Sequence, residues 1–176
     1  DRIADYMAAQ DIVPTDTVNQ VVDHAVNSGA FDYEMQELGV SKEELRDGMI
    51  NISKIESSGG HLSKERQVSP TGAQGLFQVL ETTARGVLEP NNYFGEKAAQ
   101  AAGLPLETLR NMSREELQSF LLNDDRGNAL FSAAVIMQKL KHNQNKKRAD
   151  YRKGGEVNGS NERHTNGSSY LEGRTR

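Results

Sequence analysis

A helix with clear sequence boundaries, followed at once by a glycine-rich loop, constrains this chain more than any other feature. Ser41 and Glu44 form a capping-box pattern at the start of the helix, and Gly59-Gly60 provides a stop signal. We therefore expect a helix over residues 41–57. The loop beyond it contains Gly72-Ala-Gln-Gly75, and two glycines this close permit positive φ or a close backbone approach to a ligand.

Glu56 is the residue of this helix with the most chemical interest. Leu45, Met49 and Ile52 recur at i, i+4 and i+7, which predicts the buried stripe, and Glu56 follows at about 20° from Leu45 around the axis. It also lies in the last turn, at the negative end of the helix dipole. Burial and the dipole both raise the pKa of a carboxyl, which a general acid requires. The alternative is an ordinary helix-end glutamate whose side chain reaches water.

The loop supplies a polar group suited to sugars. The Gln78 amide carries both a donor and an acceptor, which matches the hydroxyl and acetamido groups of a saccharide. A Gly-x-x-Gly turn alone would be a weak signal. The complete string is more specific: Glu56-Ser57, then Ser69-x-x-Gly72-Ala73-x-Gly75-Leu76-Phe77-Gln78-Val79, then Thr83-Ala84.

This string resembles the soluble-type lytic transglycosylases and their relatives, the goose-type lysozymes. Its Ser-Pro-Thr-Gly-Ala sequence, with Phe before Gln, resembles the bacteriophage branch of the family. Two weaker blocks follow in the family's order. The run 124–128 with Ser132 resembles an Asp-Pro-x-x-Asn block followed by a small residue, and the stretch around Tyr151 resembles an Ala-Tyr-Asn-x-Gly block. Tyr170-Leu171 is similar to a final Tyr-Val pair, so that the resemblance covers residues 45–172.

The resemblance implies the following site. Glu56 is the catalytic acid and base, and the Tyr151 hydroxyl approaches its carboxylate. The saccharide groove is lined by the substrate-binding residues Ser69, Gly75, Phe77, Gln78 and Leu80. The chain departs from the family in a longer segment before Ser69, in Glu81 where a proline is usual, and in Arg152 where an asparagine follows the tyrosine.

The number of carboxylates decides the reaction. Most glycosidases need two, and the candidates for a second are Glu65, Glu81, Asp124 and Asp125. The family manages with one glutamate, which protonates the oxygen between N-acetylmuramic acid and N-acetylglucosamine and then deprotonates the muramoyl C6 hydroxyl. The resemblance thus implies a peptidoglycan lytic transglycosylase that forms 1,6-anhydro-muramic acid. The alternatives are a goose-type muramidase, which is a hydrolase, and a non-catalytic peptidoglycan-binding module of a phage particle.

The composition excludes several other classes of protein function. The chain has 176 residues, 35% of them hydrophobic, no cysteine and a net charge of −4. Disulfides are excluded, no apolar run approaches the roughly 20 residues that span a bilayer, and the charge gives no attraction to nucleic acid. The histidines lack metal-ligand spacing, and no phosphate loop or dinucleotide fingerprint occurs. We expect no metal, no cofactor, no nucleic-acid partner and no membrane span, with peptidoglycan glycan strands as the partner.

The chain reads as mainly α, with the α+β character of lysozymes: a helical bundle around a saccharide cleft, with a small loop or hairpin region. Residues 1–40 are expected to be an N-terminal helical extension, and residues 41–176 the lysozyme-like catalytic domain. The other expected helices cover residues 15–28, 31–38, 83–88, 95–102, 113–122 and about 124–142. A basic cluster surrounds the end of the last helix, and residues 154–169 read as a loop.

The chain begins at Asp1 without methionine or a signal peptide, which predicts a fragment or a processed product of a longer polypeptide. Together with the phage-like wording, this indicates an enzyme of the phage virion that acts at the bacterial cell wall and periplasm. Other parts of a larger virion protein are then its expected neighbours.

Overall fold

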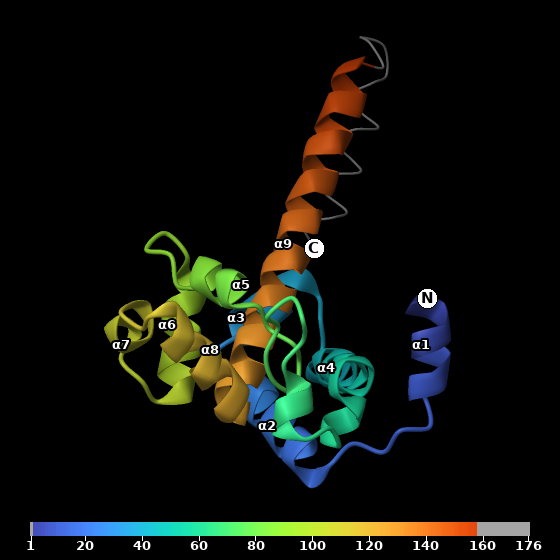
Figure 1. The fold of residues 1–176 in the computed structure, drawn as a ribbon. Coiled ribbons are helices and arrows are strands. Elements are labelled where there is room, and N and C mark those ends of the chain that lie inside the picture. Colours follow the sequence, from blue (N-terminus) through green and yellow to red (C-terminus); the bar gives the residue numbers. More distant parts are fainter. Residues whose placement is uncertain (1, 158–176) are drawn as a thin grey trace. The chain divides into compact units, whose positions relative to one another are not determined.

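The computed structural model describes residues 2–157 and is mainly helical, as expected (Figure 1). The chain divides into two compact units, one ending at Met137 and the other beginning at Gln138. Within the described residues there are no strands, only isolated β-bridges. The elements are α1 (Arg2–Ala9), α2 (Asp16–Asn27), α3 (Asp32–Leu38), α4 (Lys42–Ser57), the 3₁₀ turns η1 (Ser58–Gly60) and η2 (Lys64–Gln67), α5 (Glu81–Val87), α6 (Tyr93–Ala102), α7 (Leu106–Arg110), α8 (Arg114–Asn123) and α9 (Asp125–Val157).

The helix starts follow the capping signals in the sequence. The Ser41 and Ser113 hydroxyls each accept a hydrogen bond from the backbone N–H three residues on, and the glutamate carboxylates at those positions accept one from the backbone N–H of the cap serine. Asp124 caps α9, because its Oδ1 accepts from the Gly127 N–H at 2.8 Å. These reciprocal bonds satisfy N–H groups that have no partner inside the helix. The predicted starts of α4 and α8 are confirmed.

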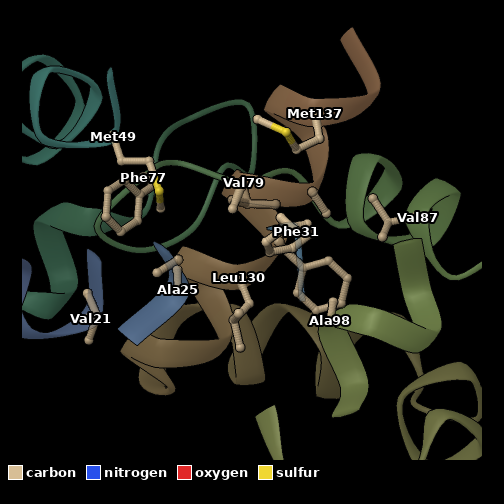
Figure 2. Packing of buried hydrophobic residues seen from close by; sticks show 14 of the residues in the cluster. Val21, Ala25, Phe31, Met49, Phe77, Val79, Val87, Ala98, Leu130 and Met137 are labelled. Carbon is tan, nitrogen blue, oxygen red and sulfur yellow. The ribbon is translucent and has the colours of Figure 1, made fainter. Parts of the chain in front are cut away.

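The core of the first unit is one hydrophobic cluster to which the N-terminal helices contribute. The four α2 residues expected to face inward are all buried, namely Val18, Val21, Val22 and Ala25. Phe31 and Met35 add the inner face of α3. Figure 2 shows the Phe77 ring beside the Met49 side chain, so that the loop after α4 shares this core. Whether residues 1–40 count as an extension of a separate catalytic domain stays a prediction.

The first half of α9 is the most buried helix segment of this unit. Ala129, Ala133 and Met137 are fully buried, as their spacing predicts. Ile136 is only half-buried, and Leu140 is 37% exposed and lies in the second unit. The Phe120 ring of α8 meets the Phe131 ring of α9 edge to face, with 6.4 Å between the ring centroids.

The expected end of the last helix near residue 142 is wrong. Helix α9 continues to Val157, and residues 154–157, which were expected to open a loop, are helical. The reason is that residues 143–153 contain neither glycine nor proline and are rich in lysine and arginine, which favour helices. The basic cluster therefore lies within a helix. The rest of the expected loop, and Tyr170-Leu171, lie outside the described residues.

Proline placement explains a helix that the sequence reading did not predict. Gly103-Leu-Pro105 ends α6 as expected, with Gly103 in the left-handed region. Pro105 then stands at the N-cap position of the short helix α7, because its fixed φ is compatible with a helix start.

Among residues 2–157, no helix combines the length and apolarity needed to cross a bilayer.

Candidate active site

The segment that follows η2 reverses direction twice and does not form a regular hairpin. It has three short extended stretches, which we call passes, at Val68, Gln74 and Val79. Gln74 forms antiparallel bridges with both Val68 and Val79. Gln74 and Val79 exchange two backbone hydrogen bonds of 3.0 Å. Gln74 therefore lies between Val68 and Val79. Of the loop residues that the family resemblance assigns to the saccharide groove, Ser69 and Leu80 directly follow these two valines, whereas Gly75, Phe77 and Gln78 lie in the turn from Gln74 to Val79.

Ser69 closes the turn between the first two passes. Its carbonyl accepts from the Gly72 N–H at 2.9 Å, and its hydroxyl accepts from the Ala73 N–H at 2.9 Å. The hydroxyl also lies 2.9 Å from the Thr71 hydroxyl. The side chain thus shapes the turn, which sets the position of the glycine-rich stretch that follows.

The Asn128 side chain on α9 forms hydrogen bonds with the glycine-rich stretch. Its Oδ1 accepts from the Phe77 N–H at 3.0 Å, and its Nδ2 donates to the carbonyls of Gln74 and Leu121 at 2.8 Å each. The side chain is fully buried. Three satisfied bonds in a water-free environment make this amide a clamp between the loop, α8 and α9.

Gly75 makes room for that clamp. Its φ is +80°, and a Cβ at this position would lie 2.5 Å from Asn128 Nδ2 and 2.6 Å from the Leu121 carbonyl oxygen. The positive φ expected from the Gly-x-x-Gly spacing is present, but the close approach is to the protein's own residues. Gly75 therefore serves the packing of the loop against α8 and α9 in this structure.

Gln78 has an unusual backbone conformation with φ of +52°, one of two non-glycine residues in the described chain with positive φ. Its Nε2 donates to the carbonyls of Gln67 at 2.7 Å and Gly75 at 3.0 Å. Because both partners are acceptors, the nitrogen must face the loop, which fixes the amide orientation. The group of Gln78 that is left for a ligand is therefore the acceptor Oε1, whereas the sequence suggested both a donor and an acceptor.

Ser57 connects the helix of Glu56 to this loop. Its buried hydroxyl lies 2.8 Å from the Leu76 carbonyl oxygen and 3.1 Å from the Ser53 carbonyl oxygen, and it accepts from the Gly60 N–H at 3.2 Å. The residue directly after Glu56 is thus fastened to the residue two before Gln78. The last turn of α4 and the loop are held together at this point.

Glu56 is exposed, and the expectation that it continues the buried stripe is wrong. The buried face of α4 instead follows the series Leu45, Met49, Ser53 and Ser57, all at most 3% exposed. Residues spaced four apart are rotated by about 40° from one to the next around the helix axis, so the buried face turns gradually along α4. In the last turn Ser57 lies on this buried face, and Glu56 points about 100° away from it.

The two bulky apolar residues of the expected groove differ in exposure. Phe77 is 4% exposed and its ring belongs to the core, so only its backbone can face a ligand. Leu80 is 37% exposed, and Val68 on the first pass is 40% exposed. These two side chains are the apolar surface that the loop presents to solvent.

Most candidates for a second carboxylate already have structural partners. Glu81 accepts from Arg85 at 3.1 Å, and Arg85 in turn donates to the carbonyls of Arg110 and Met112. Asp125 pairs with Lys64 at 2.6 Å, and Lys64 also donates to the Leu122 carbonyl. Asp124 is the cap of α9. Glu65 is exposed on η2.

Tyr151 lies in the second unit, on the helical segment 138–157, and is half-buried there. Its predicted approach to the Glu56 carboxylate stays a prediction.

A shallow hollow of about 740 Å³ lies elsewhere in the first unit, between α2, α8 and the start of α9. Several of its polar groups already serve the helix caps and the Lys64 pair, including Glu116, Asp124 and Asp125. Its lining residues are Thr17, Val21, Met112, Glu116, Ser119, Phe120, Asn123, Asp124, Asp125 and Arg126. These residues do not include those of the Glu56 loop.

Two residues matter more in the structure than in the sequence reading. In the sequence, Asn128 is only the last residue of the motif at 124–128, and Ser57 is only the residue that follows Glu56. Neither position by itself indicates the hydrogen bonds that these side chains form. The signal for Ser57 was available, because a serine inside a helix next to apolar residues must find a hydrogen-bond partner. No signal in this one sequence identifies the partners of Asn128, which lie up to 54 residues away.

Comparisons with protein-family models, with curated proteins and with solved structures found no match to this chain.

Proposed function

We propose that this protein is a peptidoglycan lytic transglycosylase in which Glu56 is the only catalytic acid and base. The observation that carries the proposal is the hydrogen bond between the Ser57 hydroxyl and the Leu76 carbonyl, at 2.8 Å. It joins the turn that bears the carboxylate to the loop that bears Gln78. A proton donor and a polar loop held together in this way suit the cleavage of a glycosidic bond.

The proposed reaction needs no second acid and no water. The Glu56 carboxyl gives its proton to the oxygen that links C1 of N-acetylmuramic acid to C4 of N-acetylglucosamine, and the C1–O bond breaks. The resulting carboxylate takes the proton of the muramoyl C6 hydroxyl, whose oxygen bonds to C1. The products are a free C4 hydroxyl and a 1,6-anhydro ring, and Glu56 regains its proton.

Exposure of Glu56 has a consequence for this reaction. Because Glu56 is an exposed residue in the folded protein, the proposed reaction requires the bound glycan to exclude water from its carboxyl group. A lysozyme-like cleft that closes over the glycan is part of the proposal. Proton transfer by a positioned carboxyl contributes roughly 10²–10⁴-fold to such reactions.

Gln78 is the proposed contact for the saccharide. Its Oε1 is an acceptor, which suits the N–H of an acetamido group or a sugar hydroxyl. Residues held in the left-handed region cost free energy and gather at functional sites, which supports this role for a φ of +52°. The exposed side chains of Val68 and Leu80 would contact the apolar faces of the sugar rings.

Muropeptide mass spectrometry of purified, digested peptidoglycan tests the proposal. Transglycosylation predicts 1,6-anhydromuropeptides, a goose-type hydrolase predicts reducing-end muropeptides, and a binding module predicts no release. Glu65→Gln and Glu81→Gln separate the first two outcomes further. Both variants should release anhydromuropeptides like the wild type, whereas one of them should be inactive if a second acid holds a water.

We further propose that the enzyme belongs to a phage particle and opens the cell wall locally, in company with other parts of a virion protein. The phage-like wording of residues 69–79 supports this context. Peptides of this chain in the mass spectrum of purified particles would agree with it. Their restriction to the lysed-cell supernatant would point to a free lysin instead.

A further inference from the structure

The turn that follows Glu56 has an exceptional backbone. Ser58, Gly59 and Gly60 have φ values of +53°, +68° and +89°, three consecutive residues in the left-handed region. The first is the C-cap of α4, and its N–H bonds back to the Ser53 carbonyl. Because the next two residues have no side chains, another segment can pack directly against their backbone.

That segment comes from the N-terminal part of the chain. Residues 12–18, which we name the strap, comprise the connection from α1 and the first residues of α2. The Thr15 N–H donates to the Gly59 carbonyl at 2.9 Å. The His61 ring nitrogen Nε2 lies 2.7 Å from the Val13 carbonyl, to which it donates. Two hydrogen bonds therefore tie the strap to the turn on either side of Gly60.

The contact between strap and turn is also sterically close. A Cβ on Gly59 would lie 2.9 Å from Ile12 Cγ2 and 3.1 Å from the Pro14 Cα. A Cβ on Gly60 would lie 2.6 Å from Thr15 Oγ1 and 2.7 Å from Val18 Cγ2. Any side chain at these positions must push the strap away from the end of α4 or move the turn.

The strap is itself fixed to the core. Thr15 caps α2, since its hydroxyl accepts from the Val18 N–H, and Val18 is fully buried. The proline ring restricts φ of Pro14. The strap is therefore a stiff support, whereas a flexible tail could not hold the turn in one position.

Glu56 lies in the last turn of α4, two residues before Ser58, so the backbone that carries its side chain belongs to the supported segment. This backbone is attached on one side to Leu76 through Ser57 and on the other to the strap through Gly59. Misplacement of a catalytic group by about 1 Å can reduce a rate roughly 10²-fold.

We propose that the strap is a positioning element for Glu56, which gives the N-terminal residues a role in the reaction. This inference rests on the proposed function. Thr15, Pro14 and His61 act through the backbone of the turn and do not touch the glycan.

A matched pair of glycine substitutions tests the inference. Gly59 and Gly39 have almost the same φ, +68° and +69°, but a Cβ on Gly39 meets no atom within 4 Å. The conformational penalty of Gly39→Ala and Gly59→Ala is thus similar, and only Gly59→Ala displaces the strap. With release of 1,6-anhydromuropeptides from soluble glycan strands as the assay, Gly59→Ala should lower kcat at least about tenfold at unchanged KM, and Gly39→Ala should keep the wild-type kcat.

A rescue variant distinguishes positioning from simple loss of stability. Ile12→Ala removes the side-chain atom nearest to the new Cβ, so Ile12→Ala combined with Gly59→Ala should recover part of kcat. His61→Ala is a milder probe that leaves the backbone unchanged, and it should lower kcat with KM unchanged. A rise in KM alone for His61→Ala would mark a groove contact and contradict the inference.

The outcomes separate the two proposals. If the wild type releases anhydromuropeptides and Gly59→Ala, Gly39→Ala and His61→Ala all match its kcat per folded molecule, the strap is only structural and the proposed function stands. If the wild type releases none while it is folded, both proposals are overturned together.

Discussion

Gly75 and Asn128 fit against each other so closely that there is no space for a side chain on Gly75. A Cβ on Gly75 would lie 2.5 Å from Asn128 Nδ2, and Asn128 in turn bonds the backbone on both sides of Gly75, at Gln74 and Phe77. The fold of the loop therefore depends on two features. Gly75 has no side chain, and the Asn128 amide beside it has hydrogen-bond partners for both its oxygen and its nitrogen.

Gly75→Ala should destabilise the protein strongly. The added methyl group meets the Leu121 carbonyl as well as the amide, and φ of +80° adds a penalty of about 1–2 kcal/mol for any non-glycine residue. We expect a loss of about 3 kcal/mol or more in the free energy of unfolding, measured with urea. Gly103→Ala is the control, because its φ is +73° and no atom lies near its Cβ. Equal losses for the two variants would contradict the proposed fit.

Asn128→Ala should cost about 2–4 kcal/mol, since it leaves the Phe77 N–H buried without its partner and removes one hydrogen bond each from the Gln74 and Leu121 carbonyls. Asn123→Ala provides a matched comparison on the preceding helix. Its amide also donates two hydrogen bonds, to Ser119, but it is exposed, so its loss should stay within about 0.5 kcal/mol. Chemical denaturation of both variants measures the difference, and similar values would show that Asn128 is not a clamp.

The sequence predicts this fold well wherever the signal is local. The capping boxes at Ser41 and Ser113 lie within four residues, and both helices begin where they predict. The end of α9 is different, because no glycine or proline interrupts residues 143–153 and the helix continues past the expected end near residue 142.

The site is predictable only in part, because its geometry depends on residues far apart in the chain. The motif directs attention to Glu56, but its exposure follows from the drift of the buried face toward Ser57. The orientation of the Gln78 amide depends on the Gln67 carbonyl, eleven residues away. The strap contact joins Val13 to His61, 48 residues apart. Periodicity carries no information about such pairs.

Gln78→Gly should separate binding from stability. Glycine relieves the positive φ, which offsets the loss of the two Nε2 hydrogen bonds, so the free energy of unfolding should change by no more than about 1 kcal/mol. If Oε1 accepts a hydrogen bond from the glycan, KM should rise about fivefold, the equivalent of one neutral hydrogen bond, with kcat retained. An unchanged KM on soluble glycan strands would remove Gln78 from the binding site.

The capping box of α8 predicts a specific pH response. The Ser113 backbone N–H, and secondarily its hydroxyl, lower the pKa of Glu116 below its ordinary value of 4.5. The charged form therefore stabilises the folded state at pH values above the unfolded pKa, and this contribution disappears as the pH falls through the folded pKa. Carboxyl NMR titration should find the lowered pKa, and Ser113→Ala should raise it only in part. An unshifted Glu116 would contradict the capping geometry.

The central claim is that one carboxyl, Glu56, both gives and takes the proton. Glu56→Gln preserves the shape of the side chain and removes the transferable proton. The measurement is the rate of 1,6-anhydromuropeptide release from purified peptidoglycan by the folded variant, with Glu43→Gln on the exposed first turn of the same helix as control. The account predicts a fall of roughly 10²–10⁴-fold for Glu56→Gln and none for the control. Wild-type release by Glu56→Gln would contradict it.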